Sequence, residues 1–343
     1  MKKNGLFIDM QPSLPWAFAQ GLEEQTGTKW DVIAYINNDI SGRGMDAIRY
    51  CKYFYYAFVI FIHRNQYDKI VAWQQFYGLL MAFYCRLFGV KKQFSLIVMT
   101  FIYKRKQGRL GNMYYSFIKY ALHSKYIDKI LVYSQQEVND YATFFAIADK
   151  FAFVPLGIDR ITDMQADRQL EQQKYILSVG RSNRDYPFLY EALKDTEYRV
   201  KILANAFSHP VVKNIELYTH VFDREMCHYL NNCFCVVIPL NDTKISSGQL
   251  VALQAMQLGK PIIVTESAGI TDYIVHGANG FIIKKEKEAL LEAPHDLYTD
   301  ENLYRTIAQN ARFDYEQKFT AKHLGVHVAN ILINTEEAKA FGS

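Results

Sequence analysis

A short polar loop before an apolar helical run carries the clearest chemistry in this sequence. The stretch TKISSGQLVALQAMQLGKPIIVT, residues 243–265, joins small polar residues to a run with helical spacing that ends in glycine, proline and a β-branched strand. Ser246 or Ser247 is expected to cap this helix, and Gly248 lets the backbone approach a ligand. Because a helix N-terminus favours negative charge, the loop either binds an anion or simply caps a buried helix.

Basic residues occur beside this loop and beside an earlier one. Lys244 stands just before the expected cap, and YILSVGRSNRD puts Gly180, Arg181 and Arg184 just after a strand. In a doubly wound domain both loops would lie at the carboxyl edge of the sheet, where such domains bind ligands. Converging cations and amide donors there suit a diphosphate.

Gln254 is a polar residue on the apolar face of the same helix. It follows Ser246 by eight residues, about two helical turns. A polar side chain in that position needs a partner, because buried polar groups are normally hydrogen-bonded. Its amide could bond a backbone group of the core, or it could reach the hydroxyls of a bound ribose.

The elements that position these residues follow an alternating strand and helix pattern. In the first part of the chain, strands are expected at 6–10, 31–37, 69–74, 94–100 and 129–134, with helices around 14–25, 44–63, 75–88 and 110–124. After a polar interval, strands are expected at 175–180, 199–205, 235–240, 261–265 and 280–284, followed by a final helix over about 303–335. This pattern predicts an α/β protein with two Rossmann-like, doubly wound parallel-sheet domains that face one another.

We expect the boundary near residues 156–172, where the chain is polar and poor in helix. The predicted domains are residues 1–158, residues 159–312 and a C-terminal segment, 313–343, whose helix packs back on the first domain. At 343 residues, half of them hydrophobic, the chain is long enough for two cores.

Several classes of protein are disfavoured by composition. Five scattered cysteines without a CxxC pair argue against a disulfide framework and favour a reducing cytoplasm. Cys233 and Cys235 alternate as core residues of a strand do, so no metal is expected there. Asp9 and Pro12 interrupt the N-terminal segment before a signal-peptide core, and the apolar run 54–62 is too short to span a bilayer.

Charge is concentrated in the first half of the chain. Residues 1–155 carry 19 lysines and arginines against 11 aspartates and glutamates, and this half is also rich in aromatic residues. No basic recognition motif is present, so a nucleic-acid partner is disfavoured. Basic and aromatic residues together favour contact with an anionic membrane surface. The cluster KRKQGR, 104–109, is a solvated loop or meets acceptor phosphate or lipid headgroups, and the helix around 49–61 is either buried or in partial membrane contact.

The opening stretch also resembles a known family. SSGQLVALQAMQLGKPIIVTESAGITDYIVHGANGFIIK is similar to the nucleotide-sugar signature of family-4-like glycosyltransferases (glycosyl transferases group 1) with the GT-B fold. FVPLGID, YILSVGRSNRDY and YEQKFTAKHL resemble the interdomain segment, the first segment of the C-terminal domain and the closing helix. The similarity covers about residues 130–330, and the first 125 residues share only the alternating pattern.

The resemblance implies a role for each matching residue. Gly180 and Arg181 would hold the donor diphosphate together with the backbone amides of Ser247 and Gly248. Gln249 would lie beside the diphosphate and sugar, and Gln254 would bind the ribose.

The sequence departs from the family pattern at several of these positions. Ser246 and Gln254 stand where the family has two glutamates, and Asp272 stands where another glutamate is common. Tyr186 replaces a basic residue, whose charge Arg184 or Lys244 would supply. The usual histidine after the fourth strand is not present in MTFIYKRK, 99–106.

We therefore expect a metal-independent, cytoplasmic glycosyltransferase without a cofactor, with a peripheral position on the cytoplasmic membrane face left open. It would use a nucleoside diphosphate sugar, with UDP-sugar favoured, and a lipid-linked saccharide acceptor of bacterial capsule or exopolysaccharide synthesis. Retention and inversion stay open. An inverting reaction needs a base, for which Asp9 is the best-placed carboxylate, although capping a loop is the more common role of such an aspartate. The alternative is an inactive partner or scaffold of an active transferase, while an oxidoreductase is disfavoured because no GxGxxG follows a first strand.

Overall fold

The computed structural model describes residues 2–12, 15–35, 45–162, 164–205 and 207–341. The chain forms two compact units: residues 1–154 together with 324–343 make unit 1, and residues 155–323 make unit 2. Within the described residues, each unit is built on one six-stranded sheet, and every strand pair in both sheets is parallel. The predicted α/β class with two doubly wound parallel sheets is therefore confirmed.

The sheet of unit 1 has the strand order β2-β1-β3-β4-β5-β6. Its strands are β1 (Lys3–Ile8), β2 (Asp31–Ala34), β3 (Tyr67–Ala72), β4 (Ser95–Val98), β5 (Lys129–Val132) and β6 (Phe151–Phe153). The chain winds one way from β1 to β2 and the other way from β3 onward, so the direction reverses between β1 and β3. The carboxyl ends of those two strands form the topological switch point of the unit.

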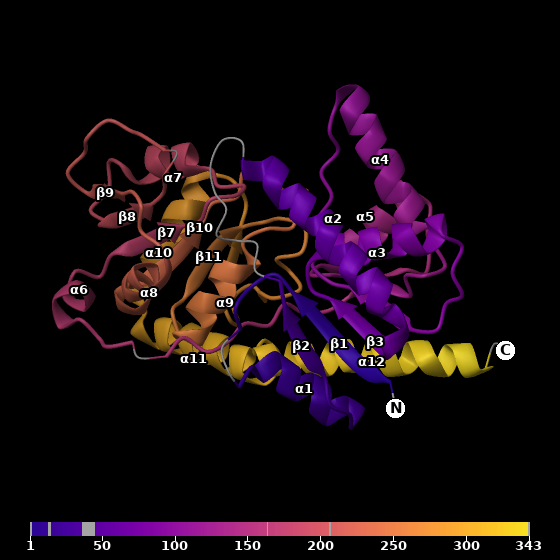
Figure 1. The fold of residues 1–343 in the computed structure, drawn as a ribbon. Coiled ribbons are helices and arrows are strands. Elements are labelled where there is room, and N and C mark those ends of the chain that lie inside the picture. The colour runs from indigo at the N-terminus through magenta and orange to yellow at the C-terminus, as the bar shows by residue number, and fades with distance from the viewer. Residues whose placement is uncertain (1, 13–14, 36–44, 163, 206, 342–343) are drawn as a thin grey trace. The chain divides into compact units, whose positions relative to one another are not determined.

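Helices cover both faces of this sheet (Figure 1). The helices are α1 (Ala17–Thr26), α2 (Met45–His63), α3 (Gln75–Leu87), α4 (Gly108–Leu122) and α5 (Gln135–Phe145), with a 3₁₀ turn over Arg64–Gln66 and most of α12 (Ala321–Phe341). Buried residues of α2, α3, α4 and α5 join one core cluster with the strands. The aromatic residues predicted around 49–61 thus form a helix with one buried side.

The last helix, α12, packs beside α1, as Figure 1 also shows. A Cβ added to Gly325 would lie 2.1 Å from the backbone oxygen of Phe18, so α1 and α12 approach as closely as glycine allows. Polar contacts fix its outer end: Lys69 Nζ lies 2.9 Å from Glu336 Oε2, and Lys339 Nζ lies 2.8 Å from Asp128 Oδ1. This helix therefore completes the second face of unit 1.

The sheet of unit 2 has the order β12-β11-β10-β7-β8-β9. Its strands are β7 (Ile176–Val179), β8 (Val200–Leu203), β9 (Ile215–Tyr218), β10 (Cys235–Ile238), β11 (Ile262–Thr265) and β12 (Phe281–Ile283). Its helices are α6 (Arg168–Gln172), α7 (Tyr186–Leu193), α8 (Asp223–Asn232), α9 (Gln249–Gln257), α10 (Lys287–Thr299) and α11 (Glu301–Lys318). Here the winding reverses between β7 and β10, so the loops after these two strands flank the switch point.

Three sequence expectations need correction or completion. The single helix expected over 303–335 is two helices, because Phe319 and Thr320 interrupt it: Ile158 N donates to Phe319 O and Ala321 N donates to Ile158 O. Strand β9 was not anticipated. Positions 14, 36, 37 and 44 of the expected elements lie outside the described residues.

The structure also bears on the expectations about cysteines, metal ligands and membrane-spanning helices. Cys233 and Cys235 are buried at and beside the start of β10, as core residues of a strand should be. The part of the chain that the structure describes contains no cluster of three or more His, Cys, Asp or Glu side chains arranged to hold a metal ion. Every helix within the described ranges is too short or too polar to cross a bilayer.

Candidate functional site

The predicted site residues of the second half meet at the switch point of unit 2. Gly180, Arg181 and Arg184 lie in the loop after β7, and Lys244 to Gly248 lie in the loop after β10. The two strands pair directly, with Cys235 opposite Ile176, so their following loops are neighbours. Open α/β sheets bind ligands in this position.

The loop after β7 is shaped by Gly180 and braced by Arg184. Gly180 has φ 134, and a Cβ there would lie 2.5 Å from Arg184 Nη2. Arg184 Nε donates to Val179 O at 3.1 Å and Nη1 donates to Ser182 O at 2.9 Å, while Tyr186 Oη donates to Gly180 O at 2.6 Å. Burial lowers the pKa of the Arg184 guanidinium. Arg184 therefore stabilises the loop by donating to the carbonyl groups of Val179 and Ser182.

Asn183, which the sequence reasoning missed, ties the two loops together. Its Nδ2 donates to Asp242 O at 2.9 Å and to Ser247 Oγ at 2.8 Å, and its Oδ1 accepts from Asp242 N at 2.7 Å. Its own φ is 56, in the left-handed region that asparagine tolerates better than most residues. One side chain thus fixes the loop after β10 on the loop after β7.

The N-terminus of α9 is capped differently from the prediction. Gly248, with φ 93, is the N-cap, and α9 has no side-chain cap bond. Ser247 Oγ instead accepts from Asn183, and Ser246 Oγ accepts from Gln249 Nε2. The expected serine cap is therefore wrong, because both hydroxyls bond neighbouring amide side chains. Since no side chain caps them, the first N–H groups of α9 can serve an anionic ligand.

A pocket of about 280 Å³ opens beside these loops. Its lining residues are Val179, Gly180, Arg181, Leu203, Ala204, Asn205, Val221, Phe222, Asp223, Met226, Leu250, Val251 and Gln254. Gln254 Oε1 is buried in its wall and has no hydrogen-bond partner within the described residues. An amide oxygen only accepts, so the group that would satisfy it is a donor such as a hydroxyl.

Arg181 is exposed at the mouth of this pocket. Its guanidinium carbon lies 4.5 Å from the centroid of the Phe222 ring, within the range of a cation–π contact. His220 and Asp223, on either side of Val221 and Phe222, have φ 58 and 46. Such angles are unfavourable for these residues and mark a constrained turn. Phe222 had no expected role, since nothing in the sequence places it near an arginine about forty residues earlier.

Two further predicted residues have simple environments. The side chain of Lys244 is exposed, and its backbone N–H donates to Asp242 Oδ1 at 2.9 Å. Lys285, which was not predicted, follows the end of β12. Its Nζ lies 2.5 Å from Asp185 Oδ2. Positive charge around the switch point therefore comes from Arg181 and Lys244, with Arg184 and Lys285 engaged by the protein itself.

In unit 1, Asp9 lies at the corresponding switch point. Gln74 Nε2 donates to Asp9 Oδ2 at 3.2 Å and to Tyr53 Oη at 3.2 Å, while Gln74 Oε1 caps α3 by accepting from Phe76 N. Burial, with a smaller contribution from the Asp9 charge, raises the pKa of Tyr53. The structure thus places Asp9 in a polar network with an amide and a phenol.

The positions after β4, where the sequence lacks the family's histidine, are structural. Thr100 has φ 52 and its hydroxyl donates to Trp73 O, and Phe101 is buried in the core. Neither side chain presents a group that could take up a proton.

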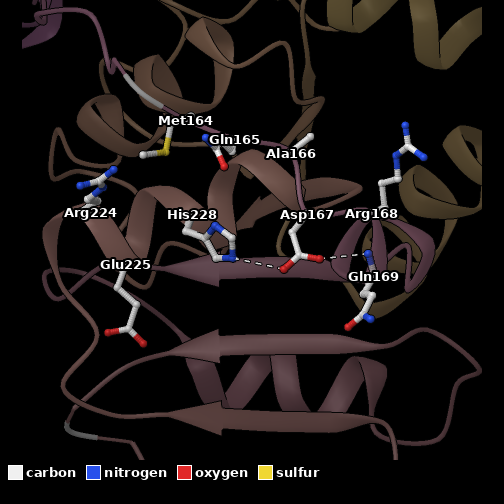
Figure 2. A pocket seen from close by; sticks show the side chains of 9 residues that line it. All are labelled: Met164, Gln165, Ala166, Asp167, Arg168, Gln169, Arg224, Glu225 and His228. Atoms are coloured by element: carbon white, nitrogen blue, oxygen red, sulfur yellow. Dashed lines mark hydrogen bonds and ion pairs between the residues drawn. The ribbon is translucent and has the colours of Figure 1, made fainter.

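A larger hollow of about 890 Å³ lies elsewhere in unit 2, between the segment before α6 and helix α8. Figure 2 shows His228 pointing toward Asp167, with Nε2 and Oδ2 3.7 Å apart. Asp167 Oδ1 also accepts from Gln169 N at 3.0 Å to cap α6. These polar groups satisfy one another, and none of the predicted site residues lines the hollow.

Comparison with known proteins finds similarity to one family in the second half of the chain. Residues 159–314 match the family model described as "Glycosyl transferases group 1". The "Uncharacterized glycosyltransferase MJ1178" of Methanocaldococcus jannaschii is 27% identical over 146 residues, which is 38% of this chain and 39% of that protein. The "Capsular polysaccharide biosynthesis glycosyltransferase CapM" of Staphylococcus aureus is 33% identical over 110 residues, 32% of this chain and 28% of that protein.

These matches span well under half the length of either relative. A likeness of fold extends over nearly the whole chain: a structure of Anabaena Alr3699/HepE in complex with UDP and glucose has a TM-score of 0.65 at 16% identity, covering 96% of this chain and 99% of that one. At this identity the likeness shows the fold alone, and it confirms the expected GT-B class.

Proposed function

Since residues 159–314 belong to the glycosyl transferases group 1 family, we propose that this chain transfers a sugar from a nucleoside diphosphate sugar to an acceptor hydroxyl. The observation that carries the proposal is the unpartnered Oε1 of Gln254 in a pocket next to Arg181 and the N-terminus of α9. An acceptor for a hydroxyl, a cationic side chain and a nearby helix N-terminus match the ribose and diphosphate of a nucleotide.

The diphosphate is assigned to the two loops at the switch point. Arg181 would turn from the Phe222 ring toward the phosphates, and the backbone amides of Ser247 and Gly248 would donate to them. Gly180 allows this close approach, because any side chain there would meet Arg184. Lys244 would add a second cation from the other loop. Asn183 and Arg184 already hold the backbone of the two loops, so the amide donors are in place before the ligand binds.

The same groups explain how transfer would be assisted. As the bond between the sugar and the diphosphate breaks, negative charge grows on the departing phosphate oxygen. Arg181, Lys244 and the amides of α9 stabilise that charge, which is the service a metal ion gives in other folds. Ser246 and Gln249, which flank Ser247 and Gly248 and bond one another, would contact the sugar. If the transfer inverts the anomeric centre, Asp9 of unit 1 is the carboxylate we assign as base.

The finer identity of the substrates is suggested by the similar proteins. Anabaena Alr3699/HepE was solved with UDP and glucose, which favours a UDP-sugar as donor. CapM is named for capsular polysaccharide biosynthesis, which favours an acceptor of that kind, a growing saccharide on a lipid carrier. Both assignments belong to the proposal for this chain.

Calorimetric titration with UDP, GDP and NAD tests the proposal. We expect saturable binding of one nucleoside diphosphate, with binding lost in Arg181→Ala. Gln254→Leu should weaken binding about tenfold, because it removes the amide oxygen that would accept from a ribose hydroxyl. Gln309→Leu, an exposed glutamine of α11, is the matched control and should bind as the wild type does.

The outcomes separate the two functions considered. Binding of one nucleoside diphosphate that depends on Arg181 and Gln254 supports a transferase. If neither UDP nor GDP binds the folded wild type, the donor site is refuted, and the alternative of a catalytically inactive partner of an active transferase becomes the better account. Binding of NAD without binding of UDP or GDP would refute both the transferase and the inactive-partner functions.

A further inference from the structure

We propose that unit 1 docks on an anionic lipid bilayer through two neighbouring features, the outer side of α2 and the tip of α4. This inference goes beyond the proposed transfer, because it rests on exposure and charge in unit 1 and uses none of the nucleotide-site residues. The occupant we assign is a bilayer whose headgroups carry negative charge.

The outer side of α2 is an apolar stripe that no described part of the chain covers. The stripe consists of Ile48, Phe54, Tyr55, Phe58 and Ile62, each at least 40% exposed. These positions recur at intervals of three, four and seven residues, so they share one side of the helix. The opposite side packs into the core. An amphipathic helix whose exposed side is aromatic and aliphatic is unusual on a surface that meets only water.

The tip of α4, residues 102–113, combines apolar and basic groups. Ile102, Leu110 and Met113 are 68%, 80% and 67% exposed. The four basic residues of the cluster 104–109 lie between them in sequence, and all are exposed. The aliphatic side chains can enter the acyl region while the lysines and arginines remain at the headgroups.

The two features lie on the same side of the unit 1 sheet. Helix α2 packs on α3, and α3 packs on α4. Ring contacts link the layer: Phe58 of α2 meets Tyr84 of α3 at 5.4 Å between centroids, and Phe83 of α3 meets Tyr120 of α4 at 5.8 Å. A single helical layer therefore presents both the stripe and the tip.

Charge decides between a bilayer and other apolar partners. Asp68 is the one acidic residue in the sequence between Asp46 and Asp128, the region that forms this helical layer. Lysines and arginines occur throughout the same region, so a second copy of this face would meet like charge. An anionic bilayer supplies both the opposite charge and an apolar interior, and it would also present a lipid-linked acceptor.

Sedimentation with phosphatidylcholine vesicles, with and without phosphatidylglycerol, tests the docking. We expect binding to the vesicles that contain phosphatidylglycerol, weakened by added salt. The double variant Leu110→Ser, Met113→Ser should bind about tenfold more weakly, and Lys104→Glu, Arg105→Glu, Lys106→Glu about a hundredfold more weakly. The matched control Val211→Ser, Phe313→Ser removes two exposed apolar side chains of unit 2 and should bind as the wild type does.

Each outcome bears on the docking separately from the nucleotide site. The melting temperatures of the same variants should match that of the wild type, which shows that they are folded whether or not a nucleotide binds. Docking is refuted if the wild type ignores both kinds of vesicle, or if the α4 variants bind them as well as the control does. It is also refuted if the wild type forms dimers in solution that the Leu110→Ser, Met113→Ser variant abolishes, because the face would then be an interface between copies.

Discussion

Replacing Asn183 by glycine should cripple nucleotide binding while leaving the fold intact. Glycine adopts the φ of 56 without strain, so the substitution removes the side-chain bonds and little else. Three hydrogen bonds disappear: the two from Nδ2 to Asp242 O and Ser247 Oγ, and the one from Asp242 N to Oδ1. At about 1 kcal/mol each, they contribute about 3 kcal/mol to holding the two loops together.

Much of that free energy should appear as weaker binding. The freed loop must be ordered again when the nucleotide binds, so the dissociation constant for UDP should rise about 10- to 100-fold. The melting temperature should fall by only a few degrees, because the affected loops are at the surface of a large chain. Calorimetry and thermal unfolding measure the two quantities on the same sample.

Two companion variants sharpen this test. Ser247→Ala removes one of the three bonds and should weaken UDP binding about fivefold. Asn183→Asp keeps the acceptor for Asp242 N but loses both donated bonds and brings negative charge toward the phosphates, so it should bind more weakly than Asn183→Gly. An Asn183→Gly protein that binds UDP within twofold of the wild type would refute the reasoning.

Other perturbations test separate features. Phe222→Leu should change UDP affinity only a few fold, because Arg181 leaves the ring when phosphate binds; a loss as large as that of Arg181→Ala would contradict this. Gly325→Ala should lower the melting temperature by several degrees, since a Cβ there meets Phe18 O; an unchanged melting temperature would show that α12 shifts freely. Burial lowers the pKa of Lys150 from 10.5 to about 8. Its charge therefore destabilises the folded state fully below pH 8, and this destabilisation declines to zero as the pH rises to 10.5. Lys150→Met should therefore raise the melting temperature at pH 7 and raise it less at pH 9.5; an equal gain at both would refute the linkage.

The fold was predictable because its strands are buried on both faces. Segments such as CVVIPL and PIIVT are continuous apolar runs, as central parallel strands are, and glycine or proline marks their ends. Strand β9 escaped because it is a short edge strand, Ile215–Tyr218, that includes Glu216. The carboxylate of Glu216 bonds Lys201 Nζ at 2.9 Å, a cross-strand pair that sequence periodicity does not reveal.

The candidate site was predictable where it depends on local chain order. Gly180 and Gly248 both have positive φ, and the loops of β7 and β10 follow directly from the strand pattern. The details that depend on tertiary contacts were not predictable. Asn183 donates to the Ser247 hydroxyl, so that hydroxyl does not cap α9. The ring of Phe222 contacts the Arg181 guanidinium. Both contacts join residues tens of positions apart in sequence.

The division of the chain into units has a consequence for how the protein is made. Unit 2 is one continuous segment, 155–323, whereas unit 1 needs both residues 1–154 and the helix that follows unit 2. During synthesis, unit 2 can close its core as soon as it leaves the ribosome, while the side of α1 around Phe18 and Leu22 waits uncovered for α12. The half of the molecule translated first is therefore the half that finishes folding last, and for that interval a chaperone that shields apolar helix faces would have its binding site on α1.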